Sequence, residues 1–346
     1  MIKNQLPKVT VVIATFNAKN MIEQCLASIR SQDYPQEKID IVIIDGSSKD
    51  NTRVIVKKFD VRVTVVSPKF QNAEYNKGVG VRKAKGELLL MLDHDNVLPH
   101  NKWLRKMVQP LLDHKNIVAV ETLRYHYNPT FSLLDRYFAL FGIGDPLAFY
   151  LGKADRLSYL YSTYNLFGKK KDMGKYYIVE FDPDRVPTLG ANGFLIRRNI
   201  LVKHAQIDTN HFFHIDVNVD LIRKGFRRYA FIKDDIIHLT GYKNISSFLY
   251  RRKLFMEQFH FKTKAARRFS VYQPRDFGKL IIFILYAATF VKPFLDAFRG
   301  YRRLPDIAWF LHPFLCFALL LIYTTVTVKT TLAKYAEYLL QEKKSF

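Results

Sequence analysis

The sequence predicts an α/β fold with a mainly parallel sheet, followed by C-terminal helices that associate with a membrane. Four mostly apolar runs, the first three rich in β-branched residues, alternate with helical segments in the first 92 residues. Alternation of this kind builds parallel sheets, and ligands bind beyond the carboxyl ends of their strands. Polar residues follow two of these runs directly. An apolar segment of 22 residues near the C-terminus, residues 307–328, predicts the membrane part.

The first two strands are predicted at residues 9–14 and 39–44, where almost every side chain is apolar. Such runs are typical of strands that are buried on both faces of a sheet. The first run leads into the Thr15-Phe16-Asn17 stretch and then into an amphipathic helix. The second ends at Asp45, and the small and capping residues after it predict a turn into a helix that begins near Asn51.

Two further strands are predicted at residues 61–66 and 87–92, with a helix between them, and the later one ends on Asp93-His94-Asp95. The remaining strands of the same domain are expected at residues 117–120 and 193–196. Residues 131–177 lie between these two and are rich in Tyr, Phe and Leu without clear periodicity, so they are predicted to form an insertion over the sheet edge. The first domain therefore covers residues 1–245.

A basic segment and two apolar segments follow this domain. Residues 246–277 interleave Lys and Arg with Phe and Tyr, which is typical of a helix that rests on lipid headgroups, and a solvated helix face is the alternative. Residues 278–330 are predicted to form a membrane hairpin. Within it, residues 307–328 are long enough to span a bilayer, whereas residues 280–295 form a short or re-entrant segment. A polar tail, residues 331–346, ends the chain.

The distribution of basic residues predicts a membrane location, with the N-terminal domain on the cytoplasmic side. The loop between the two apolar segments carries fewer basic residues than the flanking segments do. The segment before the first predicted strand is only eight residues long and mostly polar, so no signal peptide is expected there. Cys25 and Cys316, far apart, predict neither a disulfide nor a thiolate metal site.

The net charge of +23, with 54 Lys and Arg against 31 Asp and Glu, excludes few partners by itself. Because the chain is also 49% hydrophobic, the charge suits an anionic membrane surface better than a soluble partner. No zinc-ligand spacing, basic-zipper heptad or aromatic RNA-binding signature accompanies it, so no nucleic-acid partner is expected.

Asp93 and Asp95 are the strongest candidates for chemistry. Two residues apart at the end of an extended run, their side chains would point the same way and share one cation. Mg²⁺ and Mn²⁺ prefer oxygen ligands and are often held by one or two carboxylates together with substrate phosphates. The pair therefore predicts a divalent metal site that a nucleotide diphosphate completes.

The N-terminal part of the chain resembles family 2 glycosyltransferases, which have the GT-A fold. The resemblance covers roughly residues 8–240 and rests on the order and spacing of five stretches: VVIATFNA from Val11, VIIDGSSKDNT from Val42, NKGVGVRKAKGELLLMLDHDNVLP from Asn76, GANGFLIRRNIL from Gly190 and, more loosely, HIDVNVDLIRKGFRRYAFI from His214.

The resemblance implies roles for several of these residues. Residues Thr15, Phe16, Asn17 and Asp45 would contact the base and ribose of a nucleotide-sugar donor. Asp93 and Asp95 would bracket the ribose and the metal, with Asp95 as the metal ligand. The insertion at 131–177 would contact the acceptor and the membrane.

The general base is harder to assign, because Phe213 and His214 replace the acidic pair that the family pattern has before this helix. Asp216 stands where the last carboxylate of that segment belongs, and Asp220, one helical turn on, is the alternative.

Further residues that could act near the metal and the leaving diphosphate lie in other segments. His238 stands where related enzymes often supply a third metal ligand, and a purely structural histidine is the alternative. Arg251 and Arg252 either fold over the diphosphate or bind lipid headgroups. Lys69 and Lys77 are weaker candidates for the same charge.

The predicted function is inverting transfer of a monosaccharide from a nucleoside diphosphate sugar to a membrane-held acceptor, with Mg²⁺ or Mn²⁺ as cofactor. The acceptor is expected to be a lipid-linked glycan or a polyprenyl phosphate. A nucleotidyltransferase on a similar sheet and a non-catalytic membrane scaffold with a decayed transferase domain are the alternatives. Release of pyrophosphate distinguishes the first of these, and feeble nucleotide binding without metal dependence distinguishes the second.

Overall fold

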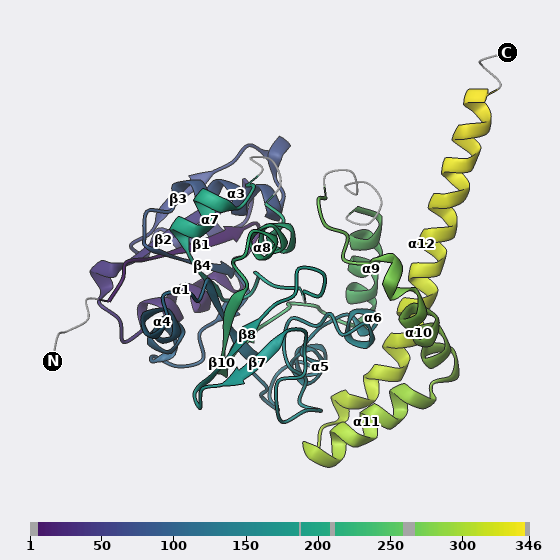
Figure 1. Cartoon of the computed structure of the whole chain (residues 1–346). Coiled ribbons are helices and arrows are strands. Elements are labelled where there is room, and N and C mark those ends of the chain that lie inside the picture. The colour runs from purple at the N-terminus through teal and green to yellow at the C-terminus, as the bar shows by residue number, and fades with distance from the viewer. Residues whose placement is uncertain (1–5, 187, 208–211, 259–266, 343–346) are drawn as a thin grey trace.

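The computed structural model describes residues 6–186, 188–207, 212–258 and 267–342. A ten-stranded mixed sheet fills the N-terminal part of the chain, and the last three long helices lie together to one side of it (Figure 1). The strand order is β3-β2-β1-β4-β9-β6-β10-β8-β7, and β5 pairs with β10 outside this path. The strands are β1 (Val9–Thr15), β2 (Ile39–Asp45), β3 (Arg62–Val65), β4 (Leu88–Asp93), β5 (Asn96–Val97), β6 (Ala119–Tyr125), β7 (Lys169–Asp172), β8 (Tyr176–Glu180), β9 (Phe194–Arg197) and β10 (Arg228–His238).

The core of this sheet is parallel, as the sequence predicted. Strands β3, β2, β1 and β4 all run in the same direction. Strand β9 lies antiparallel between β4 and β6, and β10 is parallel to β6. The α/β fold class is therefore confirmed, and the antiparallel strands make the whole sheet mixed.

Helices cover both faces of the sheet because its central strands are apolar on both sides. The helices of this part are α1 (Ile22–Arg30), α2 (Thr52–Val56), α3 (Ala73–Lys83), α4 (Trp103–Asp113), α7 (Arg198–His204) and α8 (His214–Arg223). Alternate residues of β1 point to opposite faces. Val11 joins the core that includes α1 and α4, and Val12 joins the core that includes α3 and α8. At Gly80 a Cβ atom would lie 2.2 Å from Val12 Cγ1, so only glycine lets α3 approach β1 this closely.

The segment predicted as an insertion begins with two helices, α5 (Leu133–Phe141) and α6 (Pro146–Tyr150). Its end runs into β7 and β8, a hairpin that extends the sheet beyond β10. The hairpin thus forms the sheet edge itself, whereas the sequence predicted a cover over that edge. Backbone pairing with β10, which the side-chain pattern does not encode, accounts for the difference.

The C-terminal part consists of α9 (Ile245–Phe255), α10 (Phe277–Thr289), α11 (Val291–Arg303) and α12 (Leu311–Glu342). Helices α10 and α11 form a bent pair with an angle of 80° at Phe290, whose φ is 61°. Pro293 lacks the N–H that would bond the carbonyl of Thr289, so the helix cannot continue straight across this point.

Within the described residues, one helix is long and apolar enough to cross a membrane, Ile307–Ala333, with a mean hydropathy of 1.9. Of its most apolar 18-residue window, 39% is buried inside the protein. The bent pair α10–α11 would be a second candidate only if the two helices together form a single span. By length and composition alone, this finding is weak evidence for a span.

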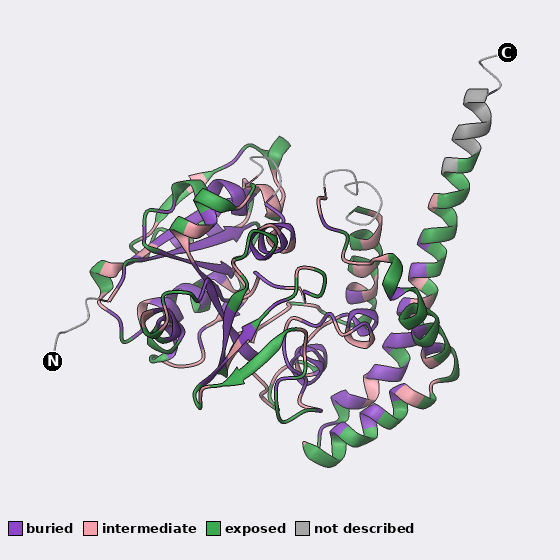
Figure 2. Ribbon diagram, viewed as in Figure 1, coloured by how far each residue is buried: buried purple, intermediate pink, exposed green. Residues whose placement is uncertain are grey.

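A third core joins these helices to α5 and α6 and contains Phe141, Phe283 and Trp309. Gly300 makes this packing close, because a Cβ atom there would lie 2.4 Å from Trp309. The outer faces are different: many exposed residues lie on α10, on α11 and on the distal part of α12 (Figure 2). The large apolar side chains among them include Phe277, Ile281, Ile282, Leu285, Val291, Leu295, Phe298, Phe314, Leu321, Val328 and Leu332.

Candidate active site

Polar residues gather where the parallel strands end. Thr15 is paired in register with Asp45, and Ala14, one residue earlier on β1, is paired with Asp93. Tyr125 and His238 end β6 and β10, which are parallel to each other. The carboxyl ends of neighbouring parallel strands meet at one edge of the sheet, which is where open α/β sheets bind their ligands.

Asp45 organises the loop after β2. Its side chain is buried, and its two carboxylate oxygens accept hydrogen bonds from Ser48, one from the backbone N–H at 2.8 Å and one from Oγ at 2.6 Å. The backbone N–H of Asn17 donates to Ser48 Oγ at 2.9 Å, so the loops after β1 and β2 are joined. Phe16 is 39% exposed beside them.

Thr15 is buried, and its Oγ1 has no hydrogen-bond partner among the described residues. Asn76 Oδ1, on α3, is likewise buried and has no hydrogen-bond partner among the described residues. A buried polar atom without a partner costs free energy, so such atoms are candidates for contact with a ligand.

Asp93 pairs with a lysine. Lys77 Nζ lies 3.2 Å from Asp93 Oδ1, and the lysine side chain is almost fully buried. Burial would lower the pKa of Lys77, but the charges of Asp93 and Glu74 outweigh that effect and raise it. Lys77 therefore places a fixed positive charge against Asp93.

Asp95 pairs with a histidine instead. His238 Nε2 lies 3.5 Å from Asp95 Oδ2, and each side chain is 21% exposed. Burial opposes the charged form of Asp95, but the charge and hydrogen bond of His238 lower the pKa of Asp95 to about 2. Strand β4 ends at Asp93, so the alternation that predicted a shared direction does not reach Asp95, and the two carboxylates have different partners.

Asp95 and His238 fit a divalent cation as two of its ligands. Among the described residues, no group of three or more His, Cys, Asp or Glu side chains is arranged to hold a metal ion. A cation held by one carboxylate and one imidazole needs further oxygen ligands, which substrate phosphates and water normally provide for Mg²⁺. The arrangement thus suits a metal that arrives with a diphosphate.

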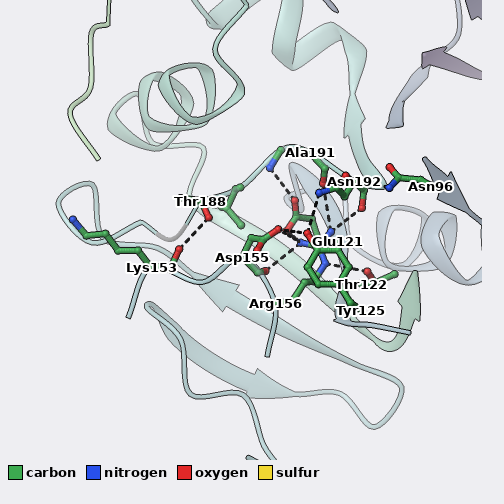
Figure 3. Close-up of polar contacts among 12 residues, drawn as sticks. Asn96, Glu121, Thr122, Tyr125, Lys153, Asp155, Arg156, Thr188, Ala191 and Asn192 are labelled. Carbon is green, nitrogen blue, oxygen red and sulfur yellow. Dashed lines mark hydrogen bonds and ion pairs between the residues drawn. The ribbon is translucent and has the colours of Figure 1, made fainter. Parts of the chain in front are cut away.

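Figure 3 shows a largely buried polar network that the sequence did not predict, and this network reaches His238 through Tyr125. Tyr125 contacts His238, with ring centroids 5.4 Å apart, and its hydroxyl donates to Asp155 Oδ2 at 2.6 Å. Asn192 Nδ2 donates to the same hydroxyl at 2.9 Å. Asn96, next to Asp95 in the chain, donates to Asn192 Oδ1 at 3.1 Å.

Arg156 is the centre of this network and is fully buried. Its guanidinium donates to Glu121 Oε2 at 2.7 Å, to the carbonyl of Asn192 at 2.8 Å and to Thr122 Oγ1 at 3.2 Å. Glu121 Oε1 accepts from the N–H of Gly190 at 2.8 Å. Burial raises the pKa of Glu121 to about 7, against the lowering effect of Arg156.

The two candidate bases on α8 are both ion-paired. Asp216 is fully buried and accepts from Arg267 Nη2 at 2.7 Å and from the N–H of Arg268 at 2.8 Å. Asp220 is 17% exposed and pairs with Arg268 Nη2 at 2.8 Å. A base must reach the proton it removes, and these ion pairs would have to open first. The assignment of either residue as base stays a prediction.

Arg252 and Arg251 lie on α9 and differ in their surroundings. Arg252 is ion-paired with Asp145, at the start of α6, and donates to Tyr323 Oη of α12 at 2.8 Å. These contacts connect three helices. Arg251 is exposed, as is Lys69. No contact between these cations and Asp93 or Asp95 is seen in the described part of the chain, so their diphosphate role also stays a prediction.

One signal in the sequence pointed to the missed network: Glu121 directly follows the apolar residues 117–120, and β6 continues through it. Its partner Arg156 lies in the segment without periodicity, so nothing in the sequence indicated that the two would meet. The residues that they position, Tyr125 and Asp155, were missed for the same reason.

Residues 10–178 match the family described as glycosyl transferase family 2. Curated relatives include glycosyltransferase AglE of Haloferax volcanii, 30% identical over 31% of this chain and 36% of that protein. Another is the GalNAc(5)-diNAcBac-PP-undecaprenol beta-1,3-glucosyltransferase of Campylobacter jejuni, 32% identical over 27% of this chain and 31% of that protein. The chain thus spans about a third of the length of these relatives.

Among solved structures, the chain is similar to the mannosyltransferase PcManGT from Pyrobaculum calidifontis in complex with GDP-Man and Mn²⁺. The TM-score is 0.46 at 18% identity, over 95% of this chain and 84% of that one.

Proposed function

We propose, from the premise that residues 10–178 belong to glycosyl transferase family 2, that this chain transfers a monosaccharide with inversion from a nucleoside diphosphate sugar to an acceptor held at a membrane. The observation that carries the proposal is the Asp95–His238 pair, 3.5 Å apart, beside Asp93 at the carboxyl edge of a parallel sheet. A diphosphate and its cation bind where such a pair is available.

The nucleoside end of the donor lies over the loops after β1 and β2. Thr15 Oγ1 and Asn76 Oδ1 are buried polar atoms that a nucleotide would satisfy. Phe16 offers an exposed ring on which a base can stack. Asp45 and Asn17 hold these loops together and face the base and ribose.

The diphosphate end lies near Asp93 and Asp95. Asp95 and His238 would hold the cation, Mg²⁺ or Mn²⁺, and Asp93 would contact the ribose. When bound, the cation neutralises the charge that develops on the leaving diphosphate. Lys77, 3.2 Å from Asp93, adds a fixed positive charge on the same side.

The acceptor is proposed to be lipid-linked, because helices α10, α11 and α12 present large apolar side chains outward and pack on α5 and α6 next to the site. The name of the Campylobacter jejuni relative, which includes PP-undecaprenol, supports a lipid-linked acceptor. We propose that the catalytic part lies on the cytoplasmic side and that the basic residues of the segment 246–277 contact lipid headgroups.

The test mixes detergent-purified protein with UDP-, GDP- and dTDP-sugars and a membrane lipid extract, with Mn²⁺ or with EDTA, and measures release of nucleoside diphosphate. The proposal expects metal-dependent release from one donor, lost in Asp95→Ala. Asp60→Ala is the matched control, because the Asp60 side chain is fully exposed far from the site. Release of pyrophosphate would indicate a nucleotidyltransferase instead. No release and no nucleotide binding would indicate a scaffold.

A further inference from the structure

The polar network beside the Asp95–His238 pair has a carboxylate to which no role has been given. Asp155 lies in the loop after α6, and Tyr125 separates it from the Asp95–His238 pair. We propose that Asp155 is the general base of the transfer and that the acceptor therefore offers a neutral sugar hydroxyl. This inference rests on the proposed function and names its base and its class of acceptor.

Asp155 is held in one orientation. Its Oδ2 accepts from Tyr125 Oη at 2.6 Å and lies 3.7 Å from Arg156 Nη1. Asn192 in turn fixes the tyrosine hydroxyl from the other side. Within the described residues Oδ1 of Asp155 makes no hydrogen bond, so the carboxylate keeps one oxygen available for a proton. A base that is already oriented loses little entropy when it acts.

Asp155 is also partly accessible. Its side chain is 14% exposed, whereas that of Asp216 is fully buried against Arg267. Asp220 is similarly exposed, at 17%, but its Oδ2 is ion-paired with Arg268 at 2.8 Å. Glu121 is buried as well, and both of its oxygens already accept hydrogen bonds, from Arg156 and from the N–H of Gly190. Among the described carboxylates considered as bases, Asp155 is thus the one that is partly exposed and not held in a short ion pair.

Its position suits the reaction. Tyr125 contacts Asp155 at its hydroxyl and His238 at its ring, so Asp155 lies one aromatic side chain away from the groups expected at the diphosphate. Inversion requires the acceptor to attack the anomeric carbon opposite the leaving group. Because Tyr125 itself fills the direct line between them, the sugar would lie over this ring, with the base on one side and the metal pair on the other.

The step balances without a further reactant. Asp155 takes the proton of the acceptor hydroxyl as its oxygen forms a bond to the anomeric carbon. The bond between that carbon and the diphosphate oxygen breaks, and the nucleoside diphosphate leaves with the electron pair. Asp155 then releases the proton to water. The net reaction consumes donor and alcohol and gives glycoside, nucleoside diphosphate and one proton.

The same carboxylate disfavours a polyprenyl phosphate acceptor. A phosphate monoester is mostly dianionic at pH 7 and has no need of a base. Next to Asp155, with Asp95 and Asp93 also nearby, it would meet like charge. Arg156 is fully buried, and its shortest ion pair is with Glu121 at 2.7 Å. A sugar hydroxyl, by contrast, gains a hydrogen bond.

The experiment compares wild type, Asp155→Asn and Asp216→Asn in the whole chain, with the donor identified above and the lipid extract as acceptor. Asparagine keeps the size of the side chain and an oxygen for Tyr125. We expect kcat to fall about 10²- to 10⁴-fold in Asp155→Asn, the usual contribution of a general base, with unchanged nucleoside diphosphate affinity. Asp172→Asn is the matched control, since Asp172 is an ion-paired carboxylate on the far hairpin.

A second variant separates chemistry from structure. Asp155→Gly with added formate should regain part of the lost turnover, because a small carboxylate can take the place of the missing base, whereas a purely structural loss would not respond. The product of the wild-type enzyme should be a glycoside and not a sugar phosphodiester. Retained turnover in Asp155→Asn, absence of formate rescue or a phosphodiester product would overturn the inference. An inactive wild type would instead refute the proposed function.

Discussion

Replacing Arg156 with methionine tests the buried network, because it removes the only guanidinium that contacts Glu121 in the described part of the chain. Methionine fills much of the same volume without a charge. Glu121 would then be buried with the N–H of Gly190 as its remaining described partner. Breaking a buried ion pair from one side typically costs about 3–5 kcal/mol of unfolding free energy.

Part of that cost depends on pH. The pKa of Glu121 in the folded protein, about 7, lies above its ordinary value, so the folded state holds this proton more tightly than the unfolded chain does. Glu121 therefore contributes stability at low pH, and the contribution is lost as pH rises towards 7. Loss of Arg156 raises this pKa further. Above pH 7, Glu121 keeps its proton in the folded variant but releases it in the folded wild type. The unfolding free energy of the variant therefore falls by a further ~1.4 kcal/mol per pH unit relative to the wild type.

The assay is thermal unfolding in detergent at pH 6, 7 and 8. At roughly 2 °C per kcal/mol, the Tm difference between wild type and Arg156→Met should be nearly constant from pH 6 to pH 7 and should widen by about 3 °C at pH 8. Adding Glu121→Gln to the variant should remove the widening, since no titrating group is left. An equal Tm difference at all three pH values would refute the reasoning.

Three further changes test other parts of the structure. His238→Ala should lower the Mn²⁺-dependent affinity for nucleoside diphosphate about 10- to 100-fold and leave affinity in EDTA unchanged, as measured by calorimetry, because a metal contact alone is lost. Thr15→Val should weaken nucleotide binding several-fold with no loss of Tm, since the buried hydroxyl has no partner in the described chain; a lower Tm would show that the hydroxyl has a structural role. Arg252→Met should lower the unfolding free energy by about 2–4 kcal/mol through Asp145, whereas exposed Arg251→Met should change it by less than about 0.5 kcal/mol, both followed by thermal unfolding.

The sequence was sufficient for the parallel core of the sheet. Residues 9–14 and 39–44 form β1 and β2 as predicted, because runs of buried β-branched residues have few alternatives to a central strand. The predicted ends of the strands at 39–44 and 87–92 also placed Asp45 and Asp93 correctly, at the carboxyl ends of β2 and β4. Local pattern alone determines such features.

The remaining parts depend on contacts between distant segments. The bond from Tyr125 to Asp155 and the ion pair from Arg267 to Asp216 join residues 30 and 51 positions apart. Neither pairing leaves a periodic trace in the sequence. The pairing of Asp95 with His238, 143 positions apart by their numbers, was anticipated only through the family resemblance.

The bend of 80° between α10 and α11 would have a mechanical consequence if these helices insert into a membrane. A bent amphipathic element that enters from one side displaces lipid in the near leaflet only and leaves the far leaflet intact. Such a wedge is accommodated most easily where the near leaflet is stretched, as on the convex side of a small vesicle. The protein should therefore be enriched on strongly curved bilayers, and straightening the corner at Phe290 should abolish that preference without loosening the anchor.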